Sequence, residues 1–138
     1  MPRRLAIAGL AAVAAVLVNL VLYGIGRAAG GSFRFTASGS PAEVNAATVA
    51  GFSAVPLLLG LVAVALLLPV GSWVTRAALI AGPLLAVGTV PLMTLPADFD
   101  PASKVTLALC HLALVPITVF AVRAMAGQDR SAVRAMAG

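Results

Sequence analysis

Hydrophobic residues fill four long runs of the chain, and short stretches of polar residues, glycine and proline separate them. The runs cover about residues 5–26, 46–70, 73–95 and 101–123. Each is close to the roughly 20 residues that a helix needs to cross a hydrocarbon layer about 30 Å thick. Because lipid offers the backbone no hydrogen-bond partners, such segments should be helical. The pattern therefore predicts an all-α membrane protein, with four antiparallel transmembrane helices in a bundle.

Composition supports this fold class and excludes others. Of the 138 residues, 62% are hydrophobic and 9% are charged, whereas soluble domains have about 45–50% apolar and 25% charged residues. The net charge of +5 comes from basic residues spread thinly along the chain, so we expect no nucleic-acid partner. The length predicts one transmembrane domain over 1–123, followed by a cytoplasmic tail over 124–138.

The basic residues between the runs predict the orientation, because Lys and Arg are enriched in cytoplasmic loops. If the N-terminus is cytoplasmic, six basic residues fall inside and three outside. The inside residues are Arg3, Arg4, Arg76, Arg123, Arg130 and Arg134, and the outside residues are Arg27, Arg34 and Lys104. We therefore predict a multi-pass protein of the cytoplasmic (inner) membrane, with both termini in the cytoplasm.

The first outer loop, residues 27–45, predicts a short β-hairpin. Residues 32–36 alternate in character, residues 38–41 are typical of a turn, and residues 42–44 could form the returning strand. Asn45, directly after this hairpin, is a candidate N-cap for the second helix.

Two further polar residues precede helical runs. Ser72 is a candidate cap for the third helix, and Asp100 for the fourth. Proline favours the first position of a helix, so the fourth helix should begin at Pro101.

Four polar residues lie at similar depth within the runs. Counted inward from residues 26, 46, 95 and 104, they are six or seven residues deep, which is roughly 10 Å at 1.5 Å per residue. The residues of this polar layer are Asn19, Ser53, Thr89 and His111. His111 is the only ionisable one, and an ionisable residue within a span is a functional-site hypothesis by default.

Two interpretations of the polar layer remain open. In the first, the layer lines a small cavity open to the outer face, and His111 contacts a ligand. In the second, neutral His111 bonds Asn19 or Ser53 and holds the fourth helix against the first, as polar side chains do between membrane helices.

Catalytic residues, metal ligands and cofactor sites are not predicted. Cys110 and His111 are adjacent, so on a helix they point about 100° apart and cannot form a dyad. One cysteine cannot build a cysteine-based zinc site, and one histidine cannot supply paired haem ligands. Glu43, Asp98 and Asp100 lie outside, where they could bind a cation, although helix capping and solvation are simpler explanations.

Two classes of function follow, and an enzyme ranks third. The first is a non-enzymatic membrane protein that binds a partner protein, or a second copy of itself, and stabilises a complex. The second is a small transporter or a binder of lipid or another small molecule, which uses the polar layer around His111. A filled interior favours the first class, and an open pocket favours the second.

Several features together resemble an uncharacterised family of small four-helix membrane proteins from actinobacteria. They are an Arg-Arg start, an asparagine in the first run, the hairpin-like loop, residues 91–100 and the His-Leu-Ala-Leu-Val sequence of residues 111–115. The resemblance covers about residues 4–123 and implies an architecture without an activity. It leaves out the tail, in which residues 132–138 repeat residues 121–127.

The orientation is tested by fusing to the C-terminus a reporter enzyme that is active only outside the cytoplasm. The fusion should be produced, as an immunoblot would verify, and should be silent. Activity of the reporter would overturn the predicted orientation.

Overall fold

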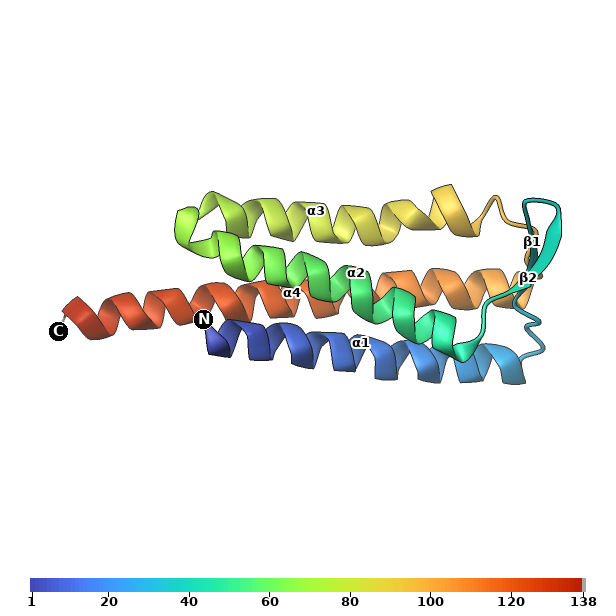
Figure 1. Ribbon diagram of the computed structural model, residues 1–138, viewed down its shortest axis with the longest axis horizontal. Coiled ribbons are helices and arrows are strands. Elements are labelled where there is room, and N and C mark those ends of the chain that lie inside the picture. The colour runs from blue at the N-terminus through green and yellow to red at the C-terminus, as the bar shows by residue number, and fades with distance from the viewer. Residues whose placement is uncertain (138) are drawn as a thin grey trace.

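The computed structural model describes residues 1–137, and the side chains of residues 1–128. The helices lie side by side and alternate in direction (Figure 1). They are α1 (Pro2–Ala28), α2 (Ala46–Leu67), α3 (Trp73–Thr89) and α4 (Pro101–Ala137). Within the part of the chain that the structure describes, four segments are long and apolar enough to cross a membrane: Pro2–Ala28, Ala46–Val70, Trp73–Thr94 and Pro101–Gln128. The mostly helical fold and the four candidate spans agree with the sequence prediction.

Short irregular turns extend two of the helices. A 3₁₀ turn, η1 (Leu68–Val70), follows α2, and a π-helical turn, η2 (Val90–Thr94), follows α3. Pro91 lies in the π-helical turn, and because proline has no N–H, it cannot continue the α-helical hydrogen-bond ladder.

Two of the three predicted helix caps are confirmed. The side chain of Asn45 accepts a hydrogen bond from the Thr48 N–H at 2.9 Å. Asp100 accepts one from the Ser103 N–H at 2.9 Å, and α4 begins at Pro101 as predicted. Ser72 precedes α3 but makes no capping hydrogen bond. Its backbone is already helical, with φ −64° and ψ −17°, whereas a capping side chain needs an extended residue.

The predicted hairpin is confirmed in the first interhelical loop. Strand β1 (Arg34–Ala37) pairs antiparallel with β2 (Ser40–Glu43). Ser38 and Gly39 connect them, with φ of 50° and 78°. Two consecutive positive φ angles are typical of a type I′ turn, whose twist matches that of paired strands. The hairpin lies at one end of the molecule, and both chain termini lie towards the other end (Figure 1). We call these the hairpin end and the terminal end.

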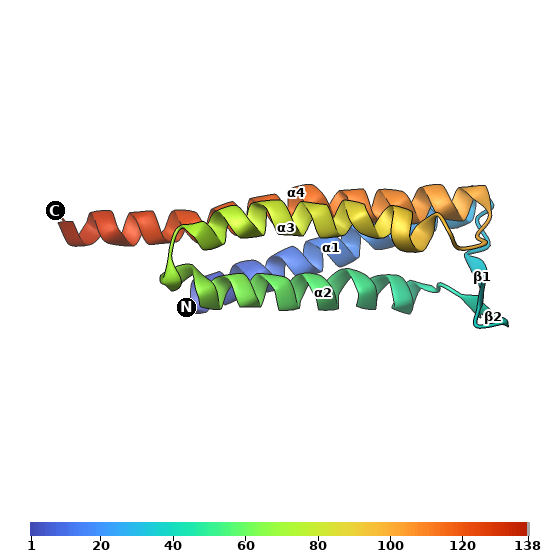
Figure 2. The ribbon, with the colours of Figure 1, turned by 90° about the horizontal axis from the view of Figure 1, so that it is seen from above.

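The four helices do not contact one another equally. Helix α1 packs against α2 and α4, and α3 packs against α4, whereas α2 and α3 make few contacts. Figure 2 shows α3 alongside α4, and it shows α2 set apart from α3. The main buried cluster joins α1, the end of α2 and α4, and consists of Ala8, Ala11, Leu61, Ala65, Leu68, Ala121, Val122 and Met125. The alanines of α1 permit a close helix approach, as small residues do in membranes.

Helix α4 continues past residue 123, where the tail was expected to begin, and its C-terminal part projects beyond the other helices (Figure 1). The first copy of the repeated heptapeptide, residues 121–127, is therefore helical. The side chains of the second copy lie outside the described residues.

At the hairpin end, Gly26 allows α1 to lie directly against α4. A Cβ atom on Gly26 would overlap the hydroxyl of Thr106 and would lie 2.9 Å from the ring of Phe33. Phe33 is fully buried and packs on Tyr23, with 4.6 Å between ring centroids. Its positive φ of 56° is rarely adopted by non-glycine residues, and it turns the chain from α1 towards the hairpin.

The close approach at Gly26 predicts that Gly26→Ala lowers the melting temperature of the purified protein in detergent. The added methyl group has to displace Thr106 and Phe33, and overpacking of this kind costs about 1–3 kcal/mol. Gly24→Ala is the matched control, because nothing lies within 4 Å of a Cβ there and alanine favours a helix. Equal shifts in the two variants would contradict the close approach.

Candidate functional site

A cleft of about 720 Å³ lies between α2, α3 and α4. It opens where α2 and α3 make few contacts, and its rim carries the exposed side chains of Phe52 on α2 and Leu85 on α3. Its lining runs from Phe35 and Phe99 at the hairpin end towards Val64 and Val122. The volume is within the range of about 300–1,000 Å³ for small-molecule sites.

All four residues of the predicted polar layer line this cleft. Each helix contributes one: Asn19 from α1, Ser53 from α2, Thr89 from α3 and His111 from α4. The remaining lining is mainly apolar. The structure therefore brings the predicted residues together as two hydrogen-bonded pairs within one cavity.

The first pair joins α1 to α2. The Asn19 Nδ2 donates to Ser53 Oγ at 2.7 Å, and Ser53 Oγ donates to the Val49 carbonyl at 2.7 Å. Asn19 is only 2% exposed, and its Oδ1 has no hydrogen-bond partner among the described residues. A buried acceptor without a partner is costly, and nearly all such groups in proteins have one. Asn19 Oδ1 thus lacks the hydrogen-bond donor that it needs, and Asn19 is one of the residues that line the cleft.

The second pair joins α3 to α4. Thr89 Oγ1 lies 2.8 Å from the Ala86 carbonyl and 2.9 Å from His111 Nδ1. A hydroxyl has a single proton, so Thr89 satisfies both contacts only if it donates to Ala86 and accepts from His111 Nδ1–H. The other ring nitrogen, Nε2, then carries a lone pair, and the described residues provide no hydrogen bond to it.

The structural interpretation of His111 named the wrong partners. His111 contacts neither Asn19 nor Ser53 by a hydrogen bond, and it links α4 to α3 rather than to α1. The neighbouring Cys110 faces α1 instead, where its Sγ lies 3.8 Å from the Asn19 carbonyl. Counting along the sequence gave the depth of His111 in the bundle. The rotation of α4 about its own axis determines which helix a side chain faces, so His111 faces α3 and Cys110 faces α1.

The acidic residues Asp98 and Asp100 hold the hairpin to the chain preceding α4. Asp98 accepts hydrogen bonds from the N–H and hydroxyl of Thr36, both at 2.7 Å. Asp100 Oδ2 accepts from the N–H of Ser32 at 3.0 Å and from its hydroxyl at 2.7 Å. The hydroxyl of Ser103 also donates to Asp100 Oδ2, at 2.6 Å.

These hydrogen bonds stabilise the charged form of both carboxyl groups. Bonds from Ser103, and then from Ser32, hold the pKa of Asp100 well below its usual range. Bonds from the backbone and side chain of Thr36 lower the pKa of Asp98. The two carboxylates therefore have a structural use that needs no cation.

Glu43, the third acidic residue considered for a cation, lies at the mouth of the cleft. It pairs with Arg27 at 3.4 Å and with Arg34 at 3.6 Å. Among the described residues, no group of three His, Cys, Asp or Glu side chains could hold a metal ion.

The aromatic residues at the cleft mouth were not among the predicted site residues. Phe35 of β1 and Phe99 pack together, with 4.8 Å between ring centroids, and both line the cleft. The alternation of residues 32–36 indicated a strand, but it did not decide whether Phe35 would lie on the bundle or on the lipid headgroups.

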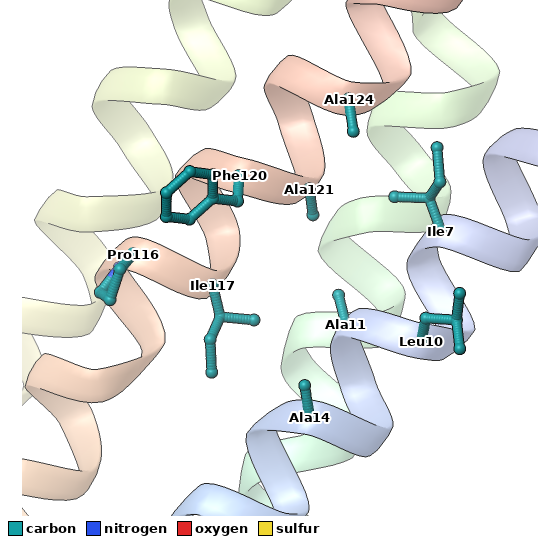
Figure 3. Close-up of a pocket in the computed structure, with 9 residues that line it drawn as sticks. All are labelled: Ile7, Leu10, Ala11, Ala14, Pro116, Ile117, Phe120, Ala121 and Ala124. Carbon is teal, nitrogen blue, oxygen red and sulfur yellow. The ribbon is translucent and has the colours of Figure 1, made fainter.

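A second hollow lies on the outside of α1 and α4, nearer the terminal end (Figure 3). Its volume is about 520 Å³. All nine lining residues are apolar: Ile7, Leu10, Ala11, Ala14, Pro116, Ile117, Phe120, Ala121 and Ala124. It offers packing surface without polar side chains that would orient a ligand.

Comparison with known proteins places the chain in a family. A model of the family of unknown function DUF6069 matches residues 1–128. The chain belongs to this family. The match confirms the resemblance to an uncharacterised family, whereas the actinobacterial source stays a prediction. No curated protein and no solved structure gives a significant match.

The depressed pKa of Asp100 predicts acid sensitivity. A carboxyl group whose pKa is lower in the folded state stabilises the protein above its unfolded pKa of about 3.9 and loses this effect as the pH falls towards the folded value. The melting temperature should therefore fall between pH 5 and pH 3.

Asp100→Asn tests the cause of this sensitivity. It replaces one acceptor oxygen with an amide nitrogen and removes the titratable group, so it should lower the melting temperature at pH 7 and reduce the loss on acidification. The same pH dependence in Asp100→Asn and in the unmodified chain would contradict the assignment.

Proposed function

We propose that this chain forms a transmembrane bundle in the cytoplasmic membrane, with both termini in the cytoplasm. Four apolar segments of sufficient length support the bundle, and the excess of Lys and Arg in the terminal-end segments supports the orientation. In this orientation the hairpin end, with the mouth of the cleft, faces outward.

We further propose that the protein is a membrane-embedded binding protein for one lipid or other amphiphilic small molecule. The observation that carries this proposal is the buried, unpartnered Oδ1 of Asn19 in the wall of a cleft of about 720 Å³. An open pocket lined by the polar layer favours small-molecule binding over a filled scaffold. Binding alone explains the cleft, without transport or catalysis.

The lining of the cleft fits an amphiphile. Apolar side chains such as Leu57, Leu107 and Leu114 surround the space, and they would contact a hydrocarbon chain. The polar layer provides a few hydrogen-bonding groups at one depth. Ligand sites commonly combine a predominantly apolar wall with a small number of placed polar groups.

A partner helix is the second candidate occupant. The cleft extends along α2 and α3, and its rim has large exposed apolar residues, including Phe52 and Leu85. A transmembrane helix of another protein, or of a second copy, could pack there and stabilise a complex. It would leave Asn19 Oδ1 without a donor unless it carried a polar side chain at that depth.

Filling the cleft should displace a small-molecule ligand. Ala86 lines the cleft on α3, so Ala86→Leu should reduce the occupancy of a co-purified molecule at least about fivefold, measured by native mass spectrometry of protein from native membranes. Ala77 is an exposed residue of the same helix outside the cleft lining. Ala77→Leu is therefore the matched control and should retain the molecule.

The mass of the co-purified species distinguishes the two occupants. A bound species of lipid size that is lost in Ala86→Leu supports the proposal. A polypeptide that is lost in the same variant supports the partner-helix alternative, and equal effects of the two substitutions would contradict a role for the cleft.

A further inference from the structure

The cleft has a chemical preference that can be derived from its polar groups. We infer that it selects a neutral lipid whose head carries a hydroxyl group, a long-chain alcohol in chemical class, over a fatty-acid anion or a phospholipid. This inference rests on the proposed binding function and specifies its ligand.

The first argument is the lack of charge inside the cleft. Glu43 is the only charged residue among those that line it, and it lies at the mouth with Arg27 and Arg34 as partners. The deeper walls provide no cation for a phosphate or carboxylate, and no anion for an ammonium group. Burial of an unpaired charge is strongly unfavourable, so the head of the ligand should be neutral.

The second argument is the kind of hydrogen-bonding atom that the protein leaves open. The donor groups of the polar layer are already used, because Asn19 Nδ2 bonds Ser53 and His111 Nδ1–H bonds Thr89. Within the polar layer, two acceptors lack a donor among the described residues, Asn19 Oδ1 and His111 Nε2. They require a donor from the ligand, and a hydroxyl group donates, whereas an ester or a ketone does not.

The third argument is size. A space of about 720 Å³ suits one molecule of small-ligand size, so a lipid with one chain fits better than one with several. The apolar lining beyond the polar layer would surround that chain, and it includes Leu61, Val64 and Ala78.

The preference can be measured with three single-chain probes that differ only in the head. The full-length protein in phosphatidylcholine nanodiscs is labelled with a photoactivatable hexadecanol that carries a diazirine in its chain. Unlabelled 1-hexadecanol, methyl palmitate and palmitate then compete for labelling, and peptide mass spectrometry locates the labelled residues. Labelling should concentrate on the cleft walls. Hexadecanol should compete about tenfold better than methyl palmitate, which corresponds to one or two hydrogen bonds.

Two substitutions remove the open acceptors. Asn19→Leu and His111→Phe should each bring the affinities for hexadecanol and methyl palmitate within about twofold of each other. Thr106→Val is the matched control, because Thr106 is a buried α4 residue outside the cleft lining. The apolar hollow on α1 and α4 (Figure 3) is an internal control, because label there should not distinguish the heads.

The outcomes separate this inference from the proposed function. Saturable cleft labelling with equal competition by all three probes would overturn the preference and leave amphiphile binding intact. Strongest competition by palmitate, or displacement by nanodiscs containing anionic phospholipid, would also overturn it. No saturable labelling of the cleft in the unmodified protein would overturn both. The comparison of probes in the unmodified protein does not depend on whether a variant folds.

Discussion

The hydrocarbon layer provides no hydrogen bonds, and this constraint governs the polar groups within the proposed spans. Several polar side chains within the spans satisfy this constraint by donating a hydrogen bond to a backbone carbonyl of their own helix, as the hydroxyls of Ser53, Thr89 and Thr118 do. The pairs Asn19–Ser53 and Thr89–His111 then link helices that are distant in the sequence. Among the described residues, Asn19 Oδ1 is buried without a partner in the wall of the cleft, and the proposed ligand would supply the missing donor.

The same rule explains how the hairpin is held over the helices. Phe33 N–H donates to Ser103 Oγ at 2.8 Å, and that hydroxyl donates onward to Asp100. Asp100 thereby accepts hydrogen bonds both from Ser103 in the first turn of α4 and from Ser32 in the chain that leads into β1. Because the hairpin contributes Phe35 and Glu43 to the cleft mouth, the cap that starts α4 also positions the entrance of the cleft.

Features determined by local sequence could be predicted, whereas features determined by helix rotation could not. Run length identified the four helices, alternation identified the hairpin, and counting along the runs placed four polar residues in one layer. In contrast, the Thr89–His111 pair and the separation of α2 from α3 depend on how whole helices turn and pack. Ser72 failed as a cap because its backbone conformation, rather than its residue type, decides capping.

The opening between α2 and α3 has a consequence for how a ligand would reach the proposed site. In a membrane, the part of the opening that lies along the side of the two helices faces the lipid, so a ligand can exchange there within the plane of the bilayer, besides the mouth at the hairpin end. Occupancy then depends on the mole fraction of the ligand among the surrounding lipids instead of its concentration in water. A molecule that is almost insoluble in water can therefore fill such a site, and its chemical competitors are the far more abundant lipids around it.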